Sequence, residues 1–264
     1  MKGVTDQLVV KKESGIGIIE FNNQKRRNAM TFEMWEGLPI ILEDFRSDQD
    51  VRVVVLSGSG GTAFCAGADI SQFEKNRSST DTIASYDNAV ELASDTLSGF
   101  SKPTVAKIEG FCVGGGLGIA LCCDLRIAND QAVFSVPAGK LGLGYKAKGL
   151  KRLVDVVGPS MAKEIFFTAR LFTCQEALTM GLINRILPKN ILSQYIDNYA
   201  RTIAENAPLT IHAAKVVIDQ IKKPSDQYDA ILCQNVVDRC FASEDYKEGR
   251  LAFMEKRKPN FQGN

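Results

Sequence analysis

The first part of the chain changes from a strand-like to a helical hydrophobic pattern. Segments 8–12 and 16–21 are rich in apolar residues and flank Glu13-Ser14-Gly15, an arrangement typical of two strands joined by a glycine turn. Thr31 then predicts a helix N-cap, because its hydroxyl can accept a hydrogen bond from a free backbone N–H. Glu33 is favourable in the first turn of that helix. We therefore expect a hairpin followed by a helix.

The helix predicted after Thr31 contains a proline. Apolar residues recur three or four positions apart, at Trp35, Leu38, Leu42 and Phe45. Pro39 lies inside this pattern. Because proline lacks an amide proton and its ring clashes with the preceding turn, we expect it to bend or interrupt the helix.

Strand-like and helical patterns alternate through the middle of the chain. Segments 51–56, 104–108 and 125–128 are apolar runs, and the first is rich in the β-branched residues typical of a strand buried on both faces. A helix is expected between the first two segments. The glycine cluster 114–116 opens an apolar helix that ends near Cys122. Strand, loop and helix in this order predict an α/β fold with a parallel sheet.

From Lys189 onward the pattern is helical almost to the end. Apolar residues form two stripes at helical spacing, the first at Ile211, Ala214, Ile218 and Ile221 and the second at Tyr228, Ile231, Leu232, Val236 and Cys240. We therefore divide the chain into a core, residues 1–200, and a helical subdomain, residues 201–264, that packs on the core or on a partner.

Composition narrows the possible partners of the protein. Among 264 residues, 32 Lys and Arg nearly cancel 31 Asp and Glu, so no global positive field attracts nucleic acid or an anionic membrane. The N-terminus has no apolar stretch typical of a signal peptide, and no uncharged run is long enough to span a bilayer. The seven cysteines lack zinc-ligand spacing and are expected to be buried free thiols. We expect a soluble cytoplasmic protein without a bound metal.

Two loops rich in small residues are candidates for chemistry. Segment 63–70 follows the strand 51–56, and segment 110–117 follows the strand 104–108. Small residues let backbone N–H groups approach a ligand, and a helix N-terminus directs free donors at an anion. Two such loops can aim two N–H groups at one oxygen, as an oxyanion hole requires. Tight packing of a helix on a sheet produces the same local pattern.

Several spaced motifs together resemble the crotonase, or enoyl-CoA hydratase/isomerase, superfamily. They are Asn28-Ala29-Met30, segment 66–70, Gly110 with Gly114-Gly115-Gly116, Cys123-Asp124-Leu125, segment 177–184 and the tail from Lys247 to Phe261. The resemblance implies a ββα spiral core with a helical C-terminal subdomain, and an acyl-CoA thioester as the substrate. It also implies a homotrimer or a dimer of trimers. No separate cofactor is expected, because coenzyme A is part of the substrate.

The resemblance also implies roles for individual residues. The backbone N–H groups of Ala66 and Gly115 would hold the thioester oxygen as it becomes an enolate. The backbone around Ala29, Ala68 and Ile70 would face the adenine and the pantetheine.

Charged residues near these motifs are expected to serve the coenzyme or the loop. Lys25, Arg26 and Lys256 are candidates for binding the CoA phosphates, with Lys256 reaching a neighbouring subunit. The alternative for each is a solvated surface position. Asp69 is interpreted as a carboxylate that fixes the loop.

Departures from the family pattern bear on the reaction. The two catalytic glutamates of the hydratase branch correspond to Gly118 and Ala138 here, and neither residue can move a proton. Hydration of an enoyl thioester needs an activated water and an acid for the α-carbon. Decarboxylation forms the enolate by losing CO2, so it needs only a stabilised oxyanion.

One further loop resembles the methylmalonyl-CoA decarboxylase branch. Its Leu-Gly-x-x-Tyr pattern ends at Tyr145, which is either a hydrogen-bond donor in the active site or a half-buried loop aromatic. The histidine of that branch corresponds to Ala68 here. Lys146 and Lys148 either attract an anionic group or form a solvated face. The only histidine, His212, is interpreted as structural.

These observations predict a lyase or isomerase of acyl-CoA metabolism. Decarboxylase-like or other glutamate-independent chemistry is the favoured reaction. The alternatives are a weak or non-classical enoyl-CoA hydratase/isomerase and a catalytically silent acyl-CoA-binding protein.

Overall fold

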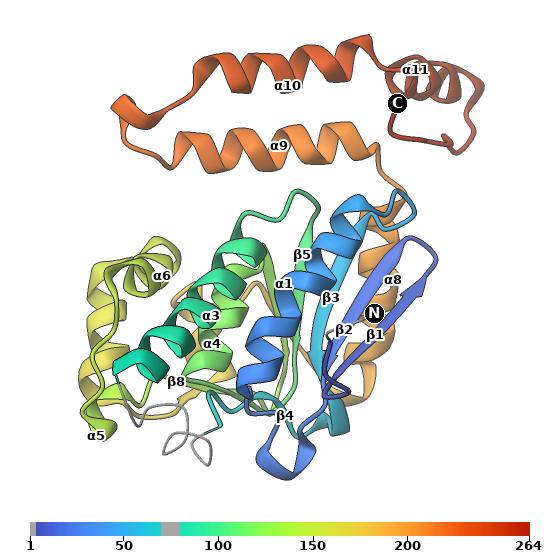
Figure 1. Cartoon of the computed structure of the whole chain (residues 1–264). Coiled ribbons are helices and arrows are strands. Elements are labelled where there is room, and N and C mark those ends of the chain that lie inside the picture. Colours follow the sequence, from blue (N-terminus) through green and yellow to red (C-terminus); the bar gives the residue numbers. More distant parts are fainter. Residues whose placement is uncertain (1–3, 70–79) are drawn as a thin grey trace.

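The N-terminal hairpin forms one edge of the larger sheet (Figure 1). In this computed structural model, which describes residues 4–69 and 80–264, strands β1 (Leu8–Glu13) and β2 (Ile16–Phe21) pair antiparallel. Ser14 and Gly15 connect them with φ values of 50° and 83°. Positive φ at both residues suits the right-handed twist of a hairpin with a two-residue turn. The predicted hairpin is confirmed.

The described strands form two sheets. The larger has the order β1-β2-β3-β5-β7-β10, and the smaller has the order β4-β6-β8-β9. The remaining strands are β3 (Val53–Gly58), β4 (Ala63–Cys65), β5 (Thr104–Ile108), β6 (Phe111–Val113), β7 (Leu125–Asn129), β8 (Val133–Ser135), β9 (Phe172–Thr173) and β10 (Arg185–Leu187). Strands β2, β3, β5, β7 and β10 pair parallel with one another, as the strand–loop–helix order predicted.

From β3 to α5 the chain winds as a spiral in which each turn gives one strand to each sheet and then a helix. Strands β3 and β4 precede α3 (Thr80–Ser98), β5 and β6 precede α4 (Gly115–Cys122), and β7 and β8 precede α5 (Ala138–Leu141). Helix α6 (Ala147–Thr168) follows α5, and α7 (Cys174–Thr179) follows β9. The expected ββα spiral is confirmed. Since β4 and β6 are adjacent, the loop after each of them reaches the same side of the small sheet.

Helix α1 (Phe32–Ser47) begins as predicted, with the Thr31 hydroxyl accepting a hydrogen bond from the Met34 N–H at 3.3 Å. The helix continues across Pro39, so the expected interruption is wrong. Leu38, on the N-terminal side of the proline, and Ile41, on the other, are fully buried. Packing of this apolar face against the core outweighs the local cost of the proline, because tertiary contacts supply most of a helix's stability.

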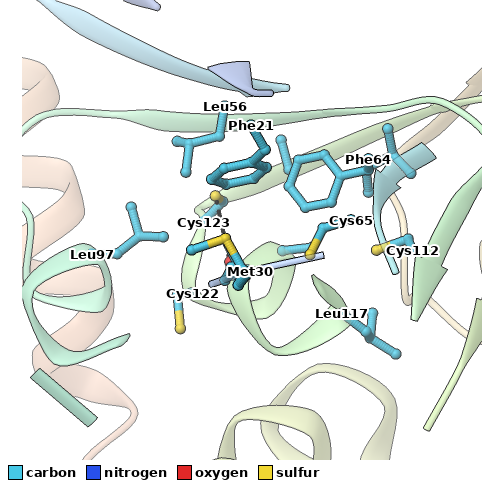
Figure 2. Close-up of a cluster of buried hydrophobic side chains, with 14 of the residues drawn as sticks. Phe21, Met30, Leu56, Phe64, Cys65, Leu97, Cys112, Leu117, Cys122 and Cys123 are labelled. Carbon is cyan, nitrogen blue, oxygen red and sulfur yellow. Dashed lines mark hydrogen bonds between the residues drawn. The ribbon is translucent and has the colours of Figure 1, made fainter. Parts of the chain in front are cut away.

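The main core lies where the two sheets meet α1, α3 and α4 (Figure 2). Phe21 and Phe64 pack edge to face with ring centroids 5.4 Å apart. Cys65, Cys112 and Cys123 are buried close by, and burial raises the pKa of the Cys65 thiol to about 12. All seven cysteines are free and five are buried, which confirms the sequence interpretation for most of them.

A second core covers the other face of the larger sheet. Helix α8 (Lys189–Ala204) packs Leu192, Ile196, Ala200 and Ala204 against Val53, Val55 and Val105. The alternate residues of β3, Val54 and Leu56, belong to the main core. This strand is therefore buried on both faces, which explains its continuous apolar run.

The last helices extend away from both cores. Helices α9 (Pro208–Ile221) and α10 (Ala230–Ala242) lie side by side beyond the sheets, followed by α11 (Glu244–Glu255) (Figure 1). Neither core cluster contains a residue of these helices. The helical pattern predicted from Lys189 is confirmed, and the division at residue 200 stays a prediction. None of the described helices is long and apolar enough to cross a membrane.

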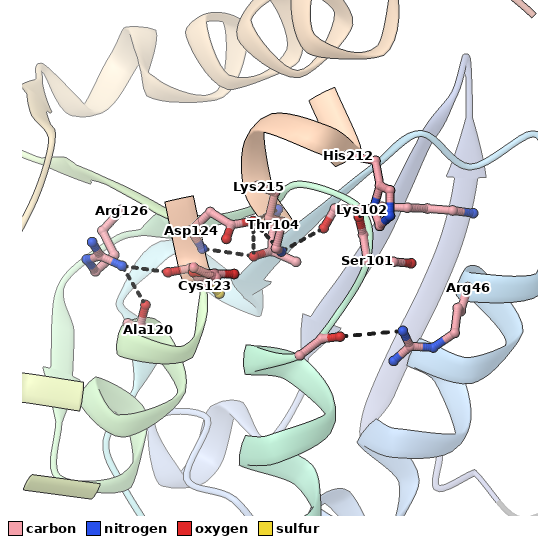
Figure 3. A network of polar contacts seen from close by, with 12 residues as sticks. Arg46, Ser101, Lys102, Thr104, Ala120, Cys123, Asp124, Arg126, His212 and Lys215 are labelled. Atoms are coloured by element: carbon pink, nitrogen blue, oxygen red, sulfur yellow. Dashed lines mark hydrogen bonds and ion pairs between the residues drawn. The ribbon is translucent and has the colours of Figure 1, made fainter. Parts of the chain in front are cut away.

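Polar contacts attach α9 to the core (Figure 3). The Lys215 ammonium donates to the Asp124 carboxylate at 2.7 Å and to the Lys102 carbonyl at 3.0 Å. The His212 Nδ1 lies 3.1 Å from the Ser101 carbonyl oxygen, in agreement with its structural interpretation. Asp124 also accepts hydrogen bonds from the backbone N–H and the hydroxyl of Thr104, at the start of β5.

Candidate active site

A cavity of about 380 Å³ lies between α3, α4 and the segment 136–153. Residues 66–68 and the glycines that begin α4 form one wall. Trp35 of α1 also lines the cavity, and its indole N–H donates to the Tyr86 hydroxyl at 3.1 Å. The cavity therefore contains both small-residue loops that the sequence indicated.

The two loops touch through their backbones. A Cβ atom placed on Gly67 would lie 3.6 Å from the Gly115 nitrogen and 3.2 Å from the Val113 carbonyl oxygen. A Cβ atom on Gly115 would lie 3.6 Å from the Ala68 nitrogen. Gly67 also has a φ of 105°, which side chains rarely tolerate. Glycine at both positions thus permits the Ala68 and Gly115 nitrogens to face the same space.

Hydrogen bonding within the first loop decides which amides are available. The Ala66 N–H donates to the Arg27 carbonyl at 3.0 Å. The Gly67 carbonyl accepts from the Met30 N–H, and the Asp69 N–H donates to the Met30 carbonyl, both at 2.8 Å. Among the described residues, no backbone acceptor is present for the Ala68 N–H, nor for the Gly67 N–H beside it. The Ala66 amide, which the resemblance implied for the oxyanion hole, is used in this structure to hold the loop.

The second loop offers the Gly115 N–H. Gly115 is the first residue of α4, where a helix has no internal acceptor for its N–H groups. The preceding Gly114 N–H donates to the Ser135 carbonyl at 2.8 Å, which fixes the loop to β8. No acceptor for the Gly115 amide is present among residues 4–69 and 80–264. The Ala68 and Gly115 amides are therefore neighbouring donors without protein partners.

The motif Asn28-Ala29-Met30 supports the first loop rather than facing the cavity. Asn28 is fully buried, and its side-chain amide donates to the carbonyl oxygens of Ser59 and Ala63 at 2.9 and 2.8 Å. Ala29 is buried, and its carbonyl accepts from the Asn23 side chain. The sequence analysis did not assign this supporting role, although a buried asparagine is a signal for it.

The other residues that were predicted to contact CoA lie in separate parts of the structure. Lys25 and Arg26 are exposed in a short 3-10 helix, Gln24–Arg26, and do not line the cavity. Lys256 caps α11, which lies at the opposite end of the molecule from β4 (Figure 1). Asp69 lies in the bonded loop described above, 3.5 Å from the Asn23 side-chain nitrogen. Ile70 lies outside the described residues.

Small and apolar residues occupy the two positions that the resemblance matched to the hydratase glutamates. Gly118 and Ala138 both line the cavity. A Cβ atom on Gly118 would meet no heavy atom within 4 Å, whereas Ala138 is buried with 3% of its surface exposed. Leu117 and Val136 beside them are apolar. The wall next to the two free amides therefore lacks a proton donor or acceptor side chain at both positions.

A series of ion pairs crosses the cavity between α3 and the start of α6. The acids Asp87, Glu91 and Asp95 lie four residues apart on α3. They pair with Lys146, Lys148 and Arg152. The two lysines are therefore paired with acids, while their side chains remain 59% and 54% exposed, as expected of a solvated face. Sequence analysis missed the acidic series, although its spacing was visible.

Tyr145 packs at the cavity wall. Its ring lies edge to face against Phe166, with centroids 4.9 Å apart, and 38% of the residue is exposed. Burial raises the pKa of the Tyr145 phenol above its ordinary value. The hydroxyl therefore remains protonated at neutral pH and can donate a hydrogen bond into the cavity.

Within the described ranges, no cluster of three or more His, Cys, Asp or Glu side chains is arranged to hold a metal ion.

A family model, individual relatives and a solved structure all indicate the same similarity. Residues 11–264 match the sequence model of the family described as enoyl-CoA hydratase/isomerase. The short-chain-enoyl-CoA hydratase of Clostridium acetobutylicum is 32% identical over 254 residues, which cover 96% of each chain. The mitochondrial methylglutaconyl-CoA hydratase of Mus musculus is 30% identical and covers 94% of this chain and 80% of its own. A solved enoyl-CoA hydratase/carnithine racemase from Magnetospirillum magneticum superposes with a TM-score of 0.94 at 32% identity, covering 98% and 97% of the two chains.

The state of the Tyr145 hydroxyl can be measured directly. We expect the alkaline absorbance titration of the native protein, minus that of Tyr145→Phe, to show one phenol whose midpoint lies above the ordinary value of about 10. The reason is that partial burial disfavours the phenolate. Circular dichroism must show that both proteins stay folded over the pH range. A difference titration with its midpoint at or below the ordinary value would contradict the placement of this ring.

Proposed function

This chain belongs to the enoyl-CoA hydratase/isomerase family, and on that premise we propose that it binds an acyl-CoA thioester and stabilises its enolate with the N–H groups of Ala68 and Gly115. The family assignment makes it an enzyme of the enoyl-CoA hydratase/isomerase superfamily. One observation carries the proposal: these two amides have no acceptor in the described chain, face each other's loops and line one cavity.

Two such donors suit the charge that develops in this chemistry. When a proton, a carboxylate or another group leaves the α-carbon of a thioester, negative charge moves to the carbonyl oxygen. Fixed N–H groups stabilise that charge without reorganising, and the N-terminus of α4 adds a positive helix dipole. The amides are rigid because the first loop is bonded to residues 27–30 and the second to Ser135.

Among reactions through an enolate, we favour a glutamate-independent one such as decarboxylation. In that step the bond between the α-carbon and the carboxylate breaks, its electron pair forms the enolate, and CO2 leaves. The α-carbon then takes a proton from water or from the Tyr145 hydroxyl. Gly118, Ala138, Leu117 and Val136 make an apolar wall beside the amides. Such a wall stabilises a carboxylate less than water does, while the amides favour the enolate.

Weak hydratase or isomerase activity is the second candidate, and the acids on α3 favour it. Asp87 and Glu91 line the cavity, so a carboxylate base is present on the wall formed by α3. Both form ion pairs with Lys146. Hydration would then use a geometry different from that of an enzyme with glutamates at the positions of Gly118 and Ala138.

We also propose that the C-terminal helices form an interface between copies of this chain, as a trimer or a dimer of trimers. Large apolar side chains on these helices are exposed, including Ile231 at 74% and Phe253 at 83%. Exposed apolar surface of this extent favours association. An interface here would also bring Lys256 of one copy toward another copy, as its expected phosphate contact requires.

Replacing single amides by esters tests the oxyanion hole. An ester at Ala68 or at Gly115 removes one N–H, and we expect turnover of a methylmalonyl-CoA or enoyl-CoA substrate to fall about 10² to 10³-fold. Binding of the CoA ester should weaken much less, because the oxygen's charge grows in the transition state. An ester at Ala66 is the comparison, and it should instead cost about 1 kcal/mol of folding stability through the lost bond to Arg27. Normal turnover by both the Ala68 and the Gly115 esters would refute the assignment.

Crotonyl-CoA distinguishes the two candidate reactions. The protein should hydrate it about 10³-fold more slowly than a hydratase with both glutamates, since acid–base catalysis supplies about 10² to 10⁴. Gly118→Glu with Ala138→Glu should raise the rate, and Gly118→Gln with Ala138→Gln is the matched control without acids. The open space at Gly118 accepts either side chain, whereas buried Ala138 requires a check of folding. A native rate equal to that of a hydratase with both glutamates would establish hydration, and Asp87→Asn and Glu91→Gln would then locate the base.

Sedimentation tests the proposed assembly. The native protein should sediment as a trimer or hexamer, and Phe253→Asp should shift it to smaller species because a buried carboxylate at an interface is costly. Phe253→Tyr keeps most of the contact area and should leave the assembly intact. A native monomer at micromolar concentration would refute the interface.

A further inference from the structure

We propose that the cavity continues as an acyl-chain channel along α4, and that Gly118 is the residue that lets a medium-chain apolar acyl group enter it. This inference rests on the proposed function, because it places the thioester oxygen at the Ala68 and Gly115 amides. It goes further by naming the class of acyl group and the residue that selects it.

The channel follows one face of α4. Gly115, Gly118 and Leu121 are spaced three residues apart and all line the cavity. At a rise of about 1.5 Å per residue, they span about 9 Å along the helix. An acyl chain that starts at Gly115 and ends at Leu121 is therefore of medium length, and an acetyl group would fill only its beginning.

Gly118 keeps the middle of this path open. A Cβ atom at this position would meet no heavy atom within 4 Å, although the residue lies inside a helix between packed neighbours. Helices α3 and α6 flank α4 and provide the opposite walls (Figure 1). A side chain at position 118 would therefore enter the space between the amides and Leu121, where the acyl chain passes.

The walls favour an apolar occupant. Val90 of α3 and Leu153 of α6 line the channel beside Leu121. Ile83 and Leu141 also line the cavity, and 40% and 52% of their surfaces remain exposed. Large apolar side chains with exposed surface on a concave wall gain free energy when an apolar ligand covers them.

Charge on the wall does not favour an acyl chain that ends in a carboxylate. The three basic residues of the cavity each pair with an acid of α3, with distances of 3.4 Å for Lys146 to Glu91 and 2.8 Å for Arg152 to Asp95. A carboxylate at the end of the acyl chain would lose hydration on binding, and the cations it would meet already pair with acids of α3. An uncharged chain has no such cost.

Binding of saturated CoA esters tests the channel without requiring turnover. Calorimetry should show that octanoyl-CoA binds the native protein more than about tenfold tighter than acetyl-CoA, because each buried methylene is worth about fourfold in affinity. Gly118→Leu should remove most of this preference and leave acetyl-CoA binding within about threefold. Gly118→Ala is the matched control: both changes raise helix propensity, but alanine leaves the path open, so the preference should persist. If Gly118→Leu does not fold, Leu121→Trp blocks the far end and should weaken octanoyl-CoA alone.

The outcomes separate this inference from the proposed function. Equal affinity of the native protein for acetyl-CoA and octanoyl-CoA refutes the channel and leaves acyl-CoA binding intact. An unchanged preference in a folded Gly118→Leu protein refutes the role of Gly118. Tighter binding of suberyl-CoA, which carries a terminal carboxylate, than of octanoyl-CoA refutes the apolar class. Failure of every ester to bind overturns the proposed function and this inference together.

Discussion

The site depends on the contact between two backbone loops, at Gly67 in one and Gly115 in the other. A side chain is disfavoured at Gly67, where φ is 105° and a Cβ would lie 3.2 Å from the Val113 carbonyl oxygen, whereas a Cβ at Gly115 would make ordinary contacts with Ala68 and Trp35. The spiral creates the contact, because β4 and β6 are neighbours in the small sheet and each loop follows its strand directly. The hydrogen bonds of residues 27–30 with residues 66–69 then decide that Ala68, and not Ala66, keeps a free N–H. Catalytic geometry here is a property of the main chain.

The two ends of α4 differ in whether their backbone groups have hydrogen-bond partners in the protein. At its C-terminal end, the buried Arg126 guanidinium donates to the carbonyl oxygens of Ala120 and Cys123, and also to that of Leu182 (Figure 3). Burial lowers the pKa of Arg126, and the carbonyl oxygens together with the negative end of the helix offset that cost. At the N-terminal end, the Gly115 amide has no protein acceptor among the described residues. Because Arg126 fixes the C-terminal end of α4, the N-terminal end is held in place and its free N–H group is available to an anion.

Sequence patterns predicted the positions of helices and strands more accurately than they predicted where polar groups point. The strand at 104–108 and the helix that ends at Cys122 agree with the structure, because continuous burial leaves a strong apolar signal. The helix is not interrupted at Pro39, which local propensity does not predict because it does not include the packing of Leu38 and Ile41. Ala66 was assigned from the family resemblance, which carries no information on the hydrogen bonds between residues 27–30 and 66–69 of this chain. The partners of the α3 acids depend on a helix far along the chain, so their spacing alone did not reveal the ion pairs.

Loss of the acid at position 118 affects shape as well as chemistry. A glutamate there would supply a proton donor or base close to the Gly115 amide, and its side chain would occupy the same open space that leads to Leu121. A proton-transferring carboxylate and a chain extending past this turn of α4 therefore compete for one volume. In the proposed function, glycine would resolve the competition in favour of the chain, and it would leave enolate formation to the two backbone amides and to groups on the substrate itself. Reaction type and acyl length would then be coupled at a single residue, because both would depend on what fills the space one turn beyond the oxyanion.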